Sequence, residues 1–160
     1  MKAWRKIIVC SIMIGAFSAS GCKNVFDIFD QEKDKKRSAL ETAKKKWNDL
    51  GAVDYTIEQR LLCFCPYNPG GYVLRVENSV IVEVKQISDG QVMSAEVASA
   101  FKSVEQLFEF IEANPEGSVE TISVEYDEDY GYPKSVFIDR DIQIADEEKR
   151  WETGKLVIIR

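Results

Sequence analysis

The sequence predicts an α+β fold in which helices cover one face of an antiparallel sheet of about six strands. Two segments repeat apolar residues at a spacing of three or four, and several others alternate apolar with polar residues. These segments follow the order helix, three strands, helix, three strands. The chain has 160 residues, of which 45% are hydrophobic. We therefore expect a single domain with one core.

The first helix is predicted over residues 37–50. Its apolar positions lie on one side, as in an amphipathic helix: Leu40, Ala43, Trp47 and Leu50. Gly51 is well placed to end it. The preceding residues 22–36 are mostly polar and charged, which predicts a tether that merges into the helix. The folded domain is accordingly placed at residues 37–160.

Three strands should follow. Residues 55–63 alternate with period two, and Pro66 with the run at 68–71 ends them in a loop. Further strands are predicted at residues 72–76 and 79–86, with Glu77-Asn78 as the hairpin turn. The valines of the third strand alternate with other residues and so share one face: Val80, Val82 and Val84.

The second half of the chain opens with a capping signal. Ser103 is the expected N-cap, and Gln106 lies three residues later, as a capping box requires. The helix carries an apolar stripe and ends at Asn114-Pro115. The last three strands are predicted at residues 118–126, 134–139 and 155–159.

An export signal is predicted at residues 1–21. A basic start precedes an apolar run from Ile7 to Phe17, which is too short to span a membrane as a helix. The residues Ala19-Ser20-Gly21-Cys22 resemble a bacterial lipobox, so Cys22 is the expected lipidation site. Cleavage after Ser20, which leaves a free secreted protein, is the alternative.

A lipidated Cys22 would hold the protein on a membrane, because each buried CH₂ of the acyl chains contributes about 0.8 kcal/mol. Lys23 follows the cysteine where inner-membrane lipoproteins often carry Asp. This favours the periplasmic side of the outer membrane over the inner membrane. The expected partners are therefore the membrane and an unknown component of the cell envelope.

Charge and composition exclude several classes of protein. The formal net charge is -6, and loss of residues 1–21 removes three basic and no acidic residues. Such a surface is a poor partner for nucleic acid. The chain has no histidine, which excludes histidine-based nucleophile activation and histidine-ligated metals. No catalytic motif is recognisable, and no cofactor is expected.

Cys63 and Cys65 would be the only intrachain thiol pair once Cys10 is removed and Cys22 lipidated. An oxidising compartment favours a local disulfide that shapes the loop. Regular strand geometry would hold their Cα atoms about 6.6 Å apart, near the upper limit for a disulfide. Reduced half-buried side chains, a redox centre and copper(I) binding by two soft thiolates remain alternatives.

A second candidate site is the turn that contains Asp127, Asp129, Tyr130 and Tyr132. The two tyrosines would make an exposed aromatic patch for a partner if they face outward, or would pack back on the sheet. The carboxylates lack the spacing of a calcium loop. General acid or base chemistry and a solvated acidic hairpin are both open for them.

Seven short segments occur in an order that resembles a bacterial domain family of unknown function, numbered 6174, found on exported proteins and lipoproteins. They are Tyr55-Thr56, Cys63-Phe64-Cys65-Pro66, Ser103-Val104-Glu105-Gln106-Leu107-Phe108, Val124-Glu125-Tyr126-Asp127, Gly131-Tyr132-Pro133, Ile138-Asp139 and Ile144-Ala145-Asp146-Glu147-Glu148. The resemblance covers about residues 47–160. It implies a fold and an export address but no reaction, and variation among members at the cysteines argues against an essential role for that pair.

These observations predict a membrane-anchored envelope lipoprotein with a binding or structural role and no catalysis. The alternative is a thiol-based redox or copper(I)-binding protein that uses Cys63 and Cys65.

Overall fold

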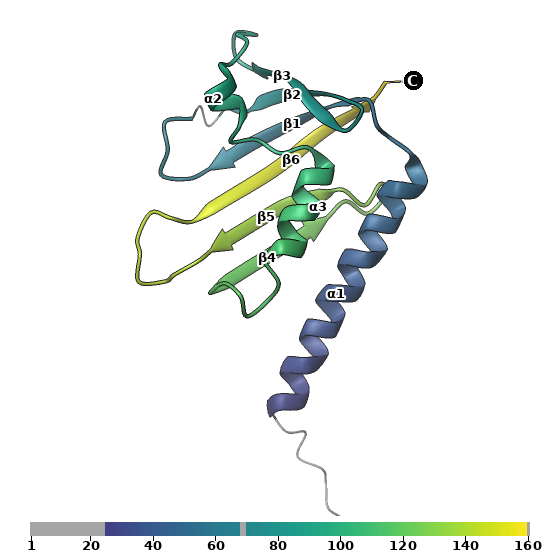
Figure 1. Ribbon diagram of the computed structural model, residues 1–160, viewed down its shortest axis with the longest axis vertical. Helices are drawn as coiled ribbons and strands as arrows, with labels where there is room; N and C mark the ends of the chain where they lie inside the picture. The colour runs from purple at the N-terminus through teal and green to yellow at the C-terminus, as the bar shows by residue number, and fades with distance from the viewer. Residues whose placement is uncertain (1–24, 68–69, 160) are drawn as a thin grey trace, which may run out of the picture.

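The computed structural model describes residues 25–67 and 70–159, with side chains from residue 30. Six antiparallel strands form one open sheet in the order β3-β2-β1-β6-β5-β4 (Figure 1). The strands are β1 (Tyr55–Leu62), β2 (Tyr72–Glu77), β3 (Val80–Gln86), β4 (Thr121–Tyr126), β5 (Pro133–Asp139) and β6 (Lys149–Ile158). The predicted α+β class and the antiparallel sheet are confirmed.

Helices α1 (Val25–Leu50) and α3 (Val104–Ala113) pack on one face of this sheet, and the short α2 (Ala95–Ala98) lies near its β3 edge (Figure 1). Helices α1 and α3 run antiparallel to each other. Lys36 of α1 contacts Glu116 just beyond the end of α3, whereas Trp47 contacts Glu105 in the first turn of α3. The first half of α1 extends away from the sheet.

Local signals set the helix ends as expected. Ser103 accepts a hydrogen bond from the backbone N–H of Gln106, and the Gln106 side chain accepts one from the backbone N–H of Ser103. The predicted capping box is therefore confirmed. Asn114 caps the end of α3, and Gly51 follows the last residue of α1 with a φ of +65°.

Sheet side chains hold the segment that leads into α3. The buried amide of Gln59 donates to the carbonyl of Lys102 and accepts from its N–H, at 3.0 and 3.1 Å. Trp151 donates from Nε1 to the carbonyl of Ala100. These bonds satisfy backbone groups that would otherwise be buried without partners, and so fix α3 over β1 and β6.

Three predicted boundaries are wrong by three residues or more, and one of them is the start of β4, which lies at Thr121 and not at residue 118. The first helix begins at Val25, not at residue 37, so residues 25–36 of the predicted tether are already helical. The last strand begins at Lys149, not at residue 155. Its first half is largely polar, and it is held by pairing with both β1 and β5, which its local composition does not reveal.

The third strand also differs from the prediction. The hairpin turn is Asn78-Ser79, with φ values of 50° and 64°, as a two-residue turn of type I′ requires. A bulge then places Val76 opposite Ile81 and Arg75 opposite Glu83. Because a one-residue shift exchanges the faces of a strand, Val80 and Val82 are exposed while Val84 is buried.

No helix in the described ranges combines the length and the apolar character needed to cross a membrane.

Candidate functional site

The first candidate site is the loop that contains Cys63 and Cys65. β1 ends at Leu62, one residue before the predicted boundary, and the chain bends immediately afterwards. The structure joins the two sulfur atoms as a disulfide, with the Cα atoms 5.2 Å apart. The bend brings the Cα atoms closer than a regular strand would allow. Phe64, between the two cysteines, is 83% exposed.

An open groove of about 460 Å³ lies next to this loop. Tyr67 and Tyr72 contribute to its wall, and both rings contact the buried ring of Phe101, at centroid distances of 6.0 and 4.6 Å. All nine lining residues are uncharged: Pro66, Tyr67, Tyr72, Gln86, Gln91, Val92, Met93, Ser94 and Val97. This is notable in a chain with 30% charged residues.

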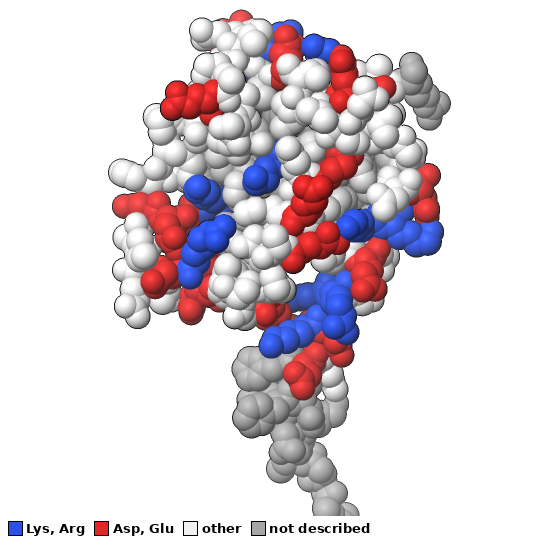
Figure 2. Space-filling view, in the orientation of Figure 1, with Lys and Arg blue, Asp and Glu red and all other residues white. Residues whose placement is uncertain are grey.

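One side of the groove is formed by the end of the edge strand β3 and the segment that follows it. Gln91–Met93 fold back as a short bridge on β3, with Val92 opposite Lys85 and one backbone hydrogen bond on each side of this pair. Val92 is 54% exposed. In Figure 1, this region and α2 lie at the end of the molecule opposite the start of α1. Figure 2 shows several charged side chains along α1.

In the second candidate site, the turn after β4, the carboxylate of Asp127 accepts hydrogen bonds from backbone groups of the turn itself. One carboxylate oxygen of Asp127 accepts hydrogen bonds from the N–H groups of Asp129 and Tyr130, at 3.0 and 2.9 Å. Such bonds are typical of an aspartate that shapes a turn. Asp129 and Tyr130 are exposed, so these two residues are available to a partner.

Tyr132 does not belong to an exposed aromatic patch. It is buried, its ring packs 6.4 Å from that of Trp47, and its hydroxyl donates to the carbonyl of Gly154. Burial, together with the negative charge of Asp127, raises the pKa of Tyr132 to about 12. The structure therefore separates the four residues of this candidate site, because Tyr132 belongs to the core.

A polar network that we did not predict joins α1, β1 and α3. The fully buried Tyr55 donates from its hydroxyl to Glu105, at 2.8 Å, and accepts from the N–H of Val104, at 2.9 Å. Trp47 donates from Nε1 to the other oxygen of Glu105. Burial, with the negative charge of Glu105 as the next cause, raises the pKa of Tyr55. No sequence pattern links residues about 50 positions apart, so only the fold reveals the network.

One amine lies half-buried among aromatic rings. The Nζ atom of Lys102 is 5.3 Å from the ring centroid of Phe110 and 5.6 Å from that of Trp151. Burial, with the nearby positive charge of Lys149, lowers the pKa of Lys102. The described residues contain no cluster of three or more His, Cys, Asp or Glu residues that could hold a metal ion.

Fold and candidate site together define a small α+β domain with an open antiparallel sheet and a disulfide-closed loop beside an uncharged groove. The chain belongs to the Family of unknown function (DUF6174), whose model matches residues 39–157. This match agrees with the resemblance seen in the sequence and includes all of the strands except the last residue of β6. The chain matches no curated protein and no solved structure.

Proposed function

We propose that this protein is a lipid-anchored component of the bacterial cell envelope whose domain binds another envelope component without catalysis. The proposal is based on the uncharged groove beside the disulfide loop. An uncharged, partly aromatic groove favours a ligand surface that is also uncharged, because a charged ligand would lose hydration there without gaining a partner.

The position of the groove fits an anchor at Cys22, which lies outside the described residues. α1 begins three residues after Cys22 and is 26 residues long. At about 1.5 Å per residue, a helix of this length extends roughly 39 Å. Since its first half projects away from the sheet, it would act as a spacer that presents the groove away from the anchoring membrane. A periplasmic location of the protein at the outer membrane is part of the same proposal.

The anchor has a direct test. Cells that express the protein are grown with an alkyne fatty acid, and the protein is expected to be labelled and to sediment with membranes. Cys22→Ala should abolish the labelling, because the thioether to the lipid requires this sulfur. Equal labelling of Cys22→Ala would contradict lipidation at this residue, and Cys10→Ala serves as the control that should label normally.

The groove has its own test. A photo-crosslinking amino acid at position 64 or 92 should give an adduct with an envelope component in living cells. The matched control is position 142, because Ile142 is 73% exposed and lies outside the groove. Val92→Asp should reduce the yield from position 64 several-fold, because it places a charge in the uncharged groove, whereas Ile142→Asp should leave it unchanged.

Crosslinking that is equally strong from position 142, or that is insensitive to Val92→Asp, would contradict binding in the groove. Neither result would contradict the proposed lipid anchor, because labelling at Cys22 is measured separately.

The disulfide favours a second candidate function, thiol-based redox chemistry or, when the pair is reduced, copper(I) binding. Both sulfur-bearing residues are half-buried, so they are partly accessible. A redox role requires Cys65 or Cys63 to form a mixed disulfide with a partner. A Cys63→Ser variant should then accumulate such an adduct through Cys65, whereas a disulfide that only shapes the loop should give none.

A further inference from the structure

The two edge strands of the sheet differ in how their outer sides are paired. At one edge, β3 pairs in part with Val92. At the other edge, β4 pairs with β5 along its whole length, and no described residue pairs with its outer side. A strand in this position presents unpaired backbone N–H and C=O groups. The edge of β4 therefore has a backbone hydrogen-bonding capacity that the described chain does not use.

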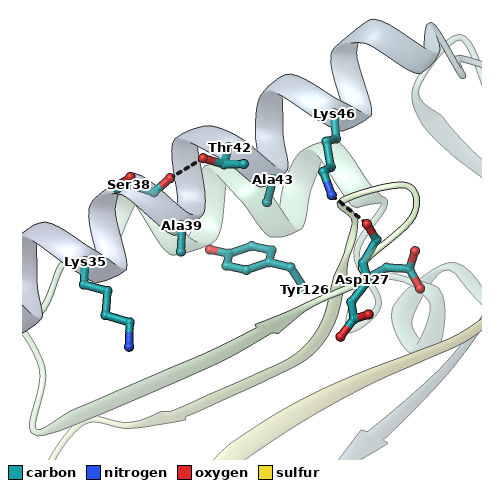
Figure 3. Close-up of a pocket in the computed structure, with 9 residues that line it drawn as sticks. Lys35, Ser38, Ala39, Thr42, Ala43, Lys46, Tyr126 and Asp127 are labelled. Atoms are coloured by element: carbon teal, nitrogen blue, oxygen red, sulfur yellow. Dashed lines mark hydrogen bonds between the residues drawn. The ribbon is translucent and has the colours of Figure 1, made fainter.

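A groove of about 400 Å³ lies between α1 and the end of β4 (Figure 3). The ring of Tyr126 lies beneath α1, and the helix presents small or short side chains above it, including Ala39 and Ser38. Lys46 closes one end of the groove by donating to the carbonyl of Glu128. The helix thus leaves space beside the strand.

The other lysine of the groove, Lys35, forms no ion pair within the described part of the chain. Lys35 lies at the opposite end from Lys46, and none of its interactions is with an acidic side chain of the described residues. Its neighbour Lys36, by contrast, pairs with Glu32 and Glu116. A ligand with a carboxylate near Lys35 would complete this end of the groove.

We propose that an extended segment of a partner polypeptide adds to β4 as a seventh strand and lies between β4 and α1. An extended polypeptide is the occupant whose own N–H and C=O groups match those of a free strand edge. The short side chains of Ala39 and Ser38 leave room for its side chains. This surface is separate from the groove beside the disulfide loop and does not depend on the function proposed for that groove.

The direction of the added strand follows from the surrounding contacts. Lys36 contacts Glu116, which precedes β4, and Lys46 contacts Glu128, which follows it. α1 and β4 therefore run the same way, and Lys35 lies toward the start of β4. In the common antiparallel pairing, the C-terminal end of the peptide meets the start of β4. An acidic residue or a free carboxylate at that end would meet Lys35.

The test uses the purified full-length protein and two synthetic libraries of octapeptides, one with free C-terminal carboxylates and one with C-terminal amides. Binding peptides are expected from the carboxylate library, and the best of them should slow hydrogen exchange at the amides of β4. Ala39→Trp should weaken binding about tenfold, because the indole fills the groove. Since Ala39 is exposed, this variant should fold normally.

Charge reversal tests the direction. Lys35→Glu should weaken binding about two- to fivefold, the range for a surface ion pair. Lys33→Glu is the matched control, because Lys33 lies on the same helix but does not line the groove, and it should have no effect. Failure of both libraries to bind, or binding that leaves exchange in β4 unchanged, would overturn the proposal.

Discussion

Gly131→Ala is expected to lower the free energy of unfolding by about 3 kcal/mol, the combined size of a left-handed backbone penalty and an overpacked contact. Gly131 has a φ of +81° and lies directly against α1. An added Cβ would overlap the carbonyl oxygen of Ala43 and lie 2.8 Å from the Cβ of Lys46. Because the first of these atoms is helix backbone, α1 would have to move. Urea denaturation measures the loss.

Gly117→Ala is the matched control for this prediction. Gly117 also has a positive φ, +89°, but an added Cβ would meet no atom within 4 Å. It should therefore cost only the backbone penalty, about 1–2 kcal/mol. If both variants lose the same stability, close packing between Gly131 and α1 does not contribute. In Gly131→Ala, but not in Gly117→Ala, the rate of hydrogen exchange should also rise in the last three turns of α1.

Tyr55→Phe is expected to lower the free energy of unfolding by about 2 kcal/mol, the usual cost of leaving buried polar groups without partners. The change removes one oxygen atom and keeps the ring that packs 5.3 Å from Trp47. It leaves the N–H of Val104 without its acceptor and removes one of two donors to Glu105. The start of α3 should lose protection from hydrogen exchange.

Tyr130→Phe is the control, because Tyr130 is 44% exposed and its side chain has no hydrogen bond within the described residues. It should change the free energy of unfolding by less than about 0.5 kcal/mol. A loss in Tyr55→Phe no larger than in Tyr130→Phe would show that the Tyr55 hydroxyl does not hold α3 on the sheet.

The elements with strong local signals were predictable. The capping box at Ser103 and Gln106, the end of α1 before Gly51 and the end of α3 before Pro115 depend on residues within one or two turns of the helix. The alternating pattern also places Tyr55, Ile57 and Leu61 on the buried face of β1. In these segments the local preference and the tertiary fold favour the same structure.

The errors occurred where distant residues decide the structure. Lys149 and Arg150 look like loop residues locally, yet they continue β6 because β1 and β5 pair with it on both sides. Val80 and Val82 alternate as buried residues would, but a bulge in β3 turns them to solvent. A periodic pattern identifies a strand without showing where its register shifts.

The candidate sites show the same division. The sequence placed Cys63 and Cys65 at the end of the first strand, but not beside an uncharged groove. That groove brings together residues 66, 67, 72, 86, 91–94 and 97, which meet only because Gln91–Met93 fold back on β3. Likewise, the sequence located the turn at Asp127 and Asp129, whereas Tyr132 was assigned to the core only by its contacts with Trp47 and Gly154.

The α+β class, the order of the main elements and the family were predictable from the sequence alone, whereas the lipid anchor at Cys22 stays a prediction. These follow from periodicity, capping residues and short motifs, all of which act over a few neighbouring positions. Only the tertiary structure decided the strand order, the network around Glu105 and the groove between β4 and α1. These features depend on strand pairing and side-chain packing between residues 50 to 103 positions apart, and no local pattern encodes such contacts.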